Sequence, residues 1–240
     1  MTRSSLSKIG LGFGGIAALA ALAALAWNYL ALPTSTQWTD EEQRLIASLS
    51  LNQLPRLPAD PSNAQADNPD AAELGHVLYF DTRLSSTGAV ACATCHKPER
   101  MFTDGLKLAV GAGIGNRHTP SLVGLSYSPW FYWDGRKDSQ WTQALAPLEA
   151  KHEHAMTRSD LARLILSDAD YSARYRSAFG ALPSVDIPAG ASPLGDDIER
   201  AKWEGLPETE QQAINEIFTN IGKALAAYQR KIQPGRARFD

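Results

Sequence analysis

Apolar residues recur at helical spacing in several parts of the chain, and no stretch alternates in the manner of a β-strand. Residues 71–80 carry one such stripe, and residues 157–165 carry a second behind the start signal Thr157-Arg-Ser-Asp160. Tyr171, Tyr175 and Phe179 recur every four residues and predict the next helix. The longest helix is predicted from about Pro207 to Ile232, with Ile214, Ile217, Ile221, Leu225 and Tyr228 on one face. The pattern predicts a mainly α protein.

Three other segments lack this periodicity or carry it only briefly. Thr39-Asp-Glu-Glu42 has the form of a capping box and predicts a short helix that ends near Leu49. Residues 54–70 are rich in Pro, Asn and Asp, which predicts a tether without regular structure ahead of a compact domain that begins near Asp70. Residues 81–129 are rich in Gly and Ser, so something other than a helix face must hold them in place.

The N-terminus has the pattern of a targeting segment. Arg3 and Lys8 precede an uncharged stretch from Ile9 to Leu32, which is long enough to cross a bilayer as a helix. Ala24-Leu25-Ala26 is also a suitable signal-peptidase site. The sequence therefore predicts a signal anchor or signal peptide over 1–32, with the uncleaved anchor favoured, a short helix and tether over 33–69, and an exported domain over 70–240.

The charge of the chain argues against nucleic-acid binding. Lys and Arg number 23 against 26 Asp and Glu, for a formal charge of -3, and no run of basic residues is present. A mildly acidic chain without a basic stripe is not expected to bind nucleic acid. The apolar fraction of 44% is sufficient for a buried core.

The two cysteines of the chain occur together in Cys92-Ala-Thr-Cys95-His96. A thioredoxin-like redox pair requires a βαβ context, which the pattern does not predict. A structural zinc site requires four ligands, and only one such pair is present. A c-type haem requires two thiols at this spacing and an adjacent histidine for the iron, so covalent haem is the favoured interpretation.

Several motifs in order resemble the bacterial di-haem cytochrome c peroxidase family, which includes MauG-like proteins. They are ELGHVLYFDTRLSSTGAVACATCH, RHTPSLVG, FYWDGR, QALAPLEAKHEHAM and IGKALAAYQR, between about Asp70 and Asp240. The resemblance implies the N-terminal half of the family's architecture, a cytochrome c-like haem domain that carries the peroxide-reacting haem. One covalent c-type haem per chain is expected, because there is one C-x-x-C-H.

The resemblance also implies roles for individual residues. Cys92 and Cys95 match the thioether attachment points, and His96 matches the proximal ligand of the haem iron. Trp133 matches a tryptophan between the two haems, a candidate electron relay. Gln143 and Glu153 match the pair of residues on the distal side of the haem, where Glu153 would move the peroxide's protons. Arg136 matches a residue that would support the site by binding a haem carboxylate or a buried acid.

The sequence departs from the family where a distal histidine is expected. The corresponding stretch is Val110-Gly-Ala112-Gly113, so that ligand is absent and an open distal face is predicted. Four residues are possible substitutes, but each is expected at the surface or behind the residues that contact the haem: Met101, His118, His152 and His154. Because His118 also stands where many members have an Asn near a calcium ion, no calcium is predicted.

A second departure is the absence of another C-x-x-C-H after residue 96. A fragment, a truncated gene and a natural single-haem protein with a partner all remain open. The expected function is reduction of hydrogen peroxide with electrons from a cytochrome or cupredoxin, on the periplasmic side of the inner membrane or in the soluble periplasm. Two alternatives are MauG-like oxidation of aromatic side chains on a partner protein and simple electron transport, which would require a sixth iron ligand.

Overall fold

A computed structural model describes residues 21–22, 27 and 38–238. The predicted anchor or signal segment, 1–32, lies outside the described residues apart from Ala21, Leu22 and Trp27. No helix within the described ranges combines the length and the apolar character needed to cross a membrane. The chain divides into two compact units, with the boundary between Leu54 and Pro55.

The first unit contains the predicted short helix, α2 (Asp40–Ser48). The Thr39 side chain accepts a hydrogen bond from the Glu42 amide, and the Glu42 carboxylate accepts one from the Thr39 amide at 2.8 Å. This reciprocal pair satisfies amides that the first turn leaves without helical partners. The capping box predicted from the sequence is confirmed.

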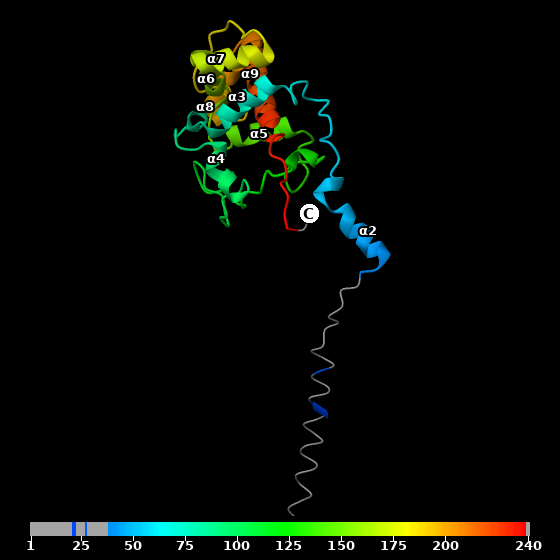
Figure 1. The fold of residues 1–240 in the computed structure, drawn as a ribbon. Coiled ribbons are helices and arrows are strands. Elements are labelled where there is room, and N and C mark those ends of the chain that lie inside the picture. Colours follow the sequence, from blue (N-terminus) through cyan, green and yellow to red (C-terminus); the bar gives the residue numbers. More distant parts are fainter. Residues whose placement is uncertain (1–20, 23–26, 28–37, 239–240) are drawn as a thin grey trace, which may run out of the picture. The chain divides into compact units, whose positions relative to one another are not determined.

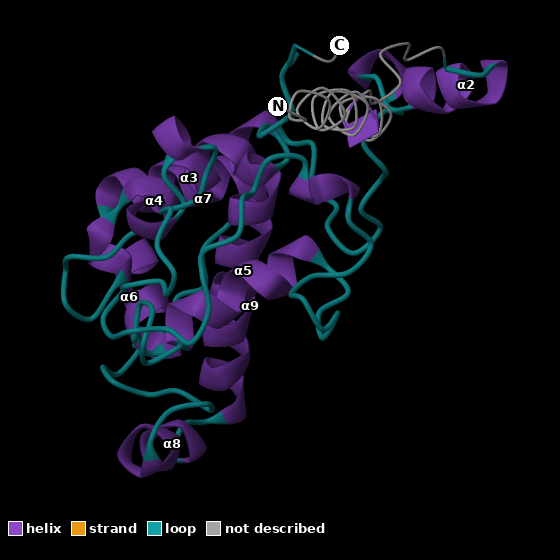
Figure 2. Cartoon of the chain, turned by 90° about the horizontal axis from the view of Figure 1, so that it is seen from below, coloured by secondary structure: helices purple, strands orange, loops and turns teal. Residues whose placement is uncertain are grey.

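The second unit is built from helices joined by long loops (Figures 1 and 2), and the described part of the chain contains no β-strand, only two isolated bridges. The mainly α prediction is confirmed. Its helices are α3 (Pro69–Phe80), α4 (Cys92–Cys95), α5 (Gln140–Glu149), α6 (Arg158–Ser167), α7 (Ala169–Phe179), α8 (Asp197–Glu204) and α9 (Glu208–Gln229).

The core forms where α3 and α5 pack against α9, as the neighbouring α3 and α9 in Figure 1 show. Leu74 and Leu78 of α3 and Leu225 of α9 are almost completely buried. The α3 and α9 backbones come very close, because a Cβ added at Gly75 would lie 2.0 Å from the Ala224 carbonyl oxygen. This crossing therefore requires glycine at position 75.

Local signals account for most helix ends. Thr157 caps α6 as predicted, and the Asp168 carboxylate accepts the Asp170 and Tyr171 amides at the start of α7. The hydrophobic pattern does not predict α5 or α8. Pro147 lies inside α5, where proline usually argues against a helix, and α8 is only 8 residues long with a single buried residue.

The segment ahead of α3 differs from the prediction. The compact unit begins at Pro55 rather than near Asp70, and the expected tether is packed against it. The buried Arg230 guanidinium donates to the Asp67 carboxylate at 2.9 Å and to the Pro58 carbonyl at 3.0 Å. Asn63, also buried, donates to the Lys223 carbonyl at 3.2 Å. These contacts with the end of α9 hold residues 58–67 in place without regular secondary structure.

Candidate functional site

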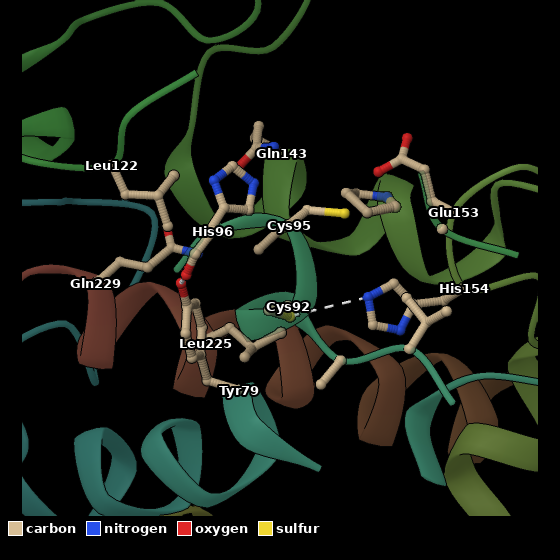
Figure 3. A pocket seen from close by; sticks show the side chains of 15 residues that line it. Tyr79, Cys92, Cys95, His96, Leu122, Gln143, Glu153, His154, Leu225 and Gln229 are labelled. Atoms are coloured by element: carbon tan, nitrogen blue, oxygen red, sulfur yellow. Dashed lines mark hydrogen bonds between the residues drawn. The ribbon is translucent and has the colours of Figure 1, made fainter. Parts of the chain in front are cut away.

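The two cysteines lie at the ends of the one-turn helix α4, and both line one pocket as free thiols (Figure 3). Burial raises the pKa of the Cys92 thiol to about 12 and raises the pKa of Cys95 as well. Redox-active cysteine pairs have the opposite property, a lowered pKa. No cluster of three His, Cys, Asp or Glu side chains suited to a metal ion occurs among the described residues.

His96, directly after α4, is oriented as a metal ligand would be. Its Nδ1 lies 3.1 Å from the Phe102 and Pro120 carbonyl oxygens, which accept the Nδ1 proton. A neutral imidazole with its proton on Nδ1 keeps a lone pair on Nε2 for a metal. Burial lowers the pKa of His96, which favours this neutral form. Two thiols and a ligating imidazole on one pocket fit a covalently attached haem.

The pocket walls come from helices that are far apart in the sequence. Tyr79 of α3, Ala144 of α5 and Leu225 of α9 line the pocket together with the residues of α4, and much of the lining is apolar. Tyr79 is completely buried, and its hydroxyl donates to the His96 carbonyl at 2.6 Å. This bond fixes the backbone of the candidate iron ligand from the α3 side. The sequence analysis did not single out Tyr79, since nothing in its local context indicates that contact.

The predicted distal pair is brought together on this pocket, with Gln143 on α5 and Glu153 in the turn that follows it. Figure 3 shows both side chains above the two cysteines in that view. Burial raises the pKa of Glu153, while the nearby charges of His152 and Arg136 lower it. A carboxyl of this kind titrates closer to neutrality than an exposed glutamate and is suited to proton transfer.

The stretch in which the sequence lacks a distal histidine lies against Glu153. The Ala112 amide donates to the Glu153 carbonyl at 2.8 Å, and a Cβ at Gly111 would lie 2.8 Å from that oxygen. Ala112 is exposed and carries no ligating atom. This geometry is compatible with an open distal face.

Trp133 and Arg136 are not among the residues that line the pocket. Trp133 is 74% exposed, and the Arg117 guanidinium lies 4.4 Å from the centre of its ring. Arg136 pairs with the exposed Asp134 at 2.9 Å and lies over the Tyr132 ring. Arg136 therefore influences Glu153 through its charge but forms no ion pair with a buried acid.

Two further residues lie at or beside the site: His154, which the sequence analysis considered only as a substitute iron ligand, and Tyr132, which it did not single out. His154 is buried, with Nδ1 3.0 Å from the Leu84 carbonyl and Nε2 4.0 Å from the Cys92 sulfur. Tyr132 lies beside Gln143 and has a positive φ of 65°. Its pKa is raised by burial and by the charge of Glu153, and lowered by Gln143. The other candidate distal ligands, Met101, His118 and His152, are exposed.

Comparison with known proteins identifies the family of this chain. Residues 69–240 match the family described as di-haem cytochrome c peroxidase. The chain belongs to this family. The members of that family bind c-type haem, the group that the thiols and imidazole of this pocket fit.

Individual relatives extend beyond the region that they share with this chain. The methylamine utilization protein MauG of Methylorubrum extorquens is 31% identical over 210 residues, covering 86% of this chain and 50% of the relative. Cytochrome c551 peroxidase of Nitrosomonas europaea is 32% identical over 116 residues, covering 48% and 35%. A solved MauG-like protein associated with microbial copper homeostasis matches with a TM-score of 0.51 and 26% identity, covering 75% and 46%. The chain spans about half the length of these relatives, or less.

Proposed function

We propose that this chain is a c-type haem peroxidase domain that reduces hydrogen peroxide with electrons from a cytochrome or cupredoxin. The observation that carries the proposal is the convergence of Cys92, Cys95 and His96 with Gln143 and Glu153 on one pocket. The two thiols would form the thioethers, and His96 Nε2 would bind the iron. The leader pattern and the covalent haem together favour the periplasmic side of the inner membrane.

A haem held by Cys92, Cys95 and His96 would supply redox-active iron for the reaction with peroxide. Glu153 takes a proton from one peroxide oxygen and returns it to the other, which then leaves as water. The Gln143 amide donates a hydrogen bond that orients the peroxide or the carboxylate. His96, with its proton donated to backbone carbonyls, stays neutral throughout. Reduction of peroxide to water consumes two electrons, so a donor must complete each turnover.

A second candidate is oxidation of aromatic side chains on a partner protein, as in MauG-like members of the family. The absence of a ligating atom at Ala112 and the exposure of Trp133 favour it. An exposed ring can exchange electrons with a partner's surface, and Trp133 is the residue that we propose for this relay. The partner would be either a protein substrate or a second haem protein.

The function is tested with Glu153→Gln, a change that keeps the size of the side chain and removes its titrating proton. We expect the covalent haem and its spectrum to be unchanged, because the His96 side of the pocket is untouched. The reaction with hydrogen peroxide, followed by stopped-flow absorption of the haem band, should slow by about a hundredfold.

Glu204→Gln is the matched control, since Glu204 is an exposed carboxylate at the end of α8. The neighbouring residue His154 would not serve as a control, because its side chain contacts Cys92 in the pocket. An unchanged peroxide reaction in Glu153→Gln, together with a six-coordinate resting iron, would contradict peroxidase function and favour simple electron transport.

A further inference from the structure

An aromatic cluster joins the haem pocket to the surface on the side of α3 and α9. The Tyr79 and Tyr228 ring centres are 5.0 Å apart, and Tyr228 lies 5.1 Å from the His76 ring. His76 and Phe80 are 5.2 Å apart, and Tyr79 and Phe80 are 5.0 Å apart. All four of these ring pairs are tilted or edge-on, and edge-on packing is an arrangement that aromatic pairs prefer. Four neighbouring rings therefore form a continuous contact path.

The inner end of this path is Tyr79, which lines the pocket and is completely buried. Its hydroxyl donates to the His96 carbonyl, an oxygen that cannot take the proton away. Tyr79 is therefore difficult to oxidise to a neutral radical, but its ring links the pocket to Tyr228.

The outer end differs because water can reach it. Tyr228 is half-buried, whereas Tyr79 is completely buried, so water has access to part of the Tyr228 side chain. Phe80 is 44% exposed, and His76 is exposed as well. His76 and Phe80, with Val77, line a shallow depression on the surface of α3. Of the two tyrosines, Tyr228 has the environment in which a neutral radical can form.

We propose that Tyr79 and Tyr228 form a relay that carries oxidising equivalents from the haem pocket to the α3–α9 surface. The relay rests on the proposed function, since its oxidant is hydrogen peroxide reacting in the pocket. Tyr228 loses one electron and its phenolic proton; the electron crosses the Tyr79 ring into the pocket, and the proton passes to water. A one-electron donor at the surface near His76 and Phe80 then returns the electron, and water returns the proton, which restores the phenol.

This route is separate from the Trp133 relay. Trp133 does not line the pocket and stacks with Arg117, whereas Tyr79 lines the pocket and contacts Tyr228. The two routes predict radicals and oxidation products at different residues, so they can be separated by experiment.

The experiment uses the full chain with covalent haem, mixed with hydrogen peroxide and frozen rapidly for electron paramagnetic resonance. The native protein should give a tyrosyl signal, and Tyr228→Phe should lose most of it. Peptide mapping by mass spectrometry should find peroxide-dependent oxidation at Tyr228.

Tyr127→Phe is the control, because Tyr127 is a half-buried tyrosine whose hydroxyl donates to the Pro55 carbonyl at 3.0 Å. It should keep the full signal. An unchanged tyrosyl signal in Tyr228→Phe, or oxidation at Trp133 alone, would overturn the relay while peroxide is still consumed. A native protein that leaves peroxide unreacted would overturn the proposed function and the relay with it. Covalent haem content establishes that each variant has folded.

Discussion

At the scale of single residues, neighbours in the sequence occupy different environments in the pocket. Glu153 is half-buried, and its carboxylate lies 3.5 Å from His152. His154, one residue later, is 4% exposed and lies between the Leu84 carbonyl and the Cys92 sulfur. Burial lowers the pKa of His154, so the folded protein holds it neutral where an unfolded chain would bind a proton.

This difference predicts a pH-dependent stability. Because the pKa of His154 is lowered from 6.5 on folding, the unfolded chain takes up a proton first as the pH falls. As far as His154 contributes, the free energy of unfolding should therefore be highest above pH 6.5. It should decrease below that pH, by at most about 1.4 kcal/mol per pH unit from this residue. Urea titrations at several pH values measure the slope.

His154→Asn provides the comparison, since the Asn amide can still donate to the Leu84 carbonyl but does not titrate. Its stability should depend less steeply on pH than that of the native protein. Parallel curves for the two proteins would show that His154 does not contribute.

At the scale of elements, α9 packs against two helices through positions that lack a side chain. A Cβ at Gly75 would meet the Ala224 carbonyl carbon at 2.5 Å, and one at Gly222 would meet the Trp141 carbonyl oxygen at 2.7 Å. Close approach of α3 and α5 to α9 places Tyr79 and Gln143 on the same pocket. The geometry of the site therefore depends on these two helix contacts.

Gly75→Ala should destabilise the fold by about 3 kcal/mol or more, because the new methyl group meets rigid backbone instead of a flexible side chain. The free energy of unfolding in urea measures the loss. Gly235→Ala serves as the control, since no heavy atom lies within 4 Å of a Cβ at that position. A Gly75→Ala protein as stable as the native one would mean that α3 and α9 can move apart without lowering the free energy of unfolding.

At the scale of the whole molecule, segments from across the second unit converge on one pocket. Residues 81–129 contain only short helical turns, yet the Thr119 hydroxyl donates to the buried Asp104 carboxylate at 2.9 Å and the Thr103 hydroxyl to the Thr119 carbonyl at 2.7 Å. Such bonds, together with α4, hold the loop around the pocket. A haem in that pocket would supply apolar surface that the loop itself lacks.

One covalent haem per chain is the corresponding prediction. The thiols of Cys92 and Cys95 are the only two in the sequence, and both line the same pocket. Intact mass after expression with a c-type maturation system should equal the apoprotein plus one haem. Haem that acid acetone extracts, or a mass equal to the bare chain, would contradict covalent attachment.

The sequence alone determined the features that depend on residues close together in the chain. The C-x-x-C-H motif spans Cys92 to His96, and the caps at Thr39 and Thr157 act within three residues. Helical stripes are also local, since they depend on side chains three and four positions apart. Motif order indicated Gln143 and Glu153 through the resemblance to the family, although their roles remain proposals.

Only the tertiary structure decided the contacts between distant residues. Tyr79 bonds to the His96 carbonyl, His154 reaches Cys92 across 62 positions, and Arg230 binds Asp67 across 163. The residues next to Tyr79 in the sequence do not indicate its contact with His96. The expected tether is packed because a buried guanidinium needs a partner, and the partner that it finds is Asp67. Packing sets these pairs, since a helix crossing brings side chains together regardless of their separation in the sequence.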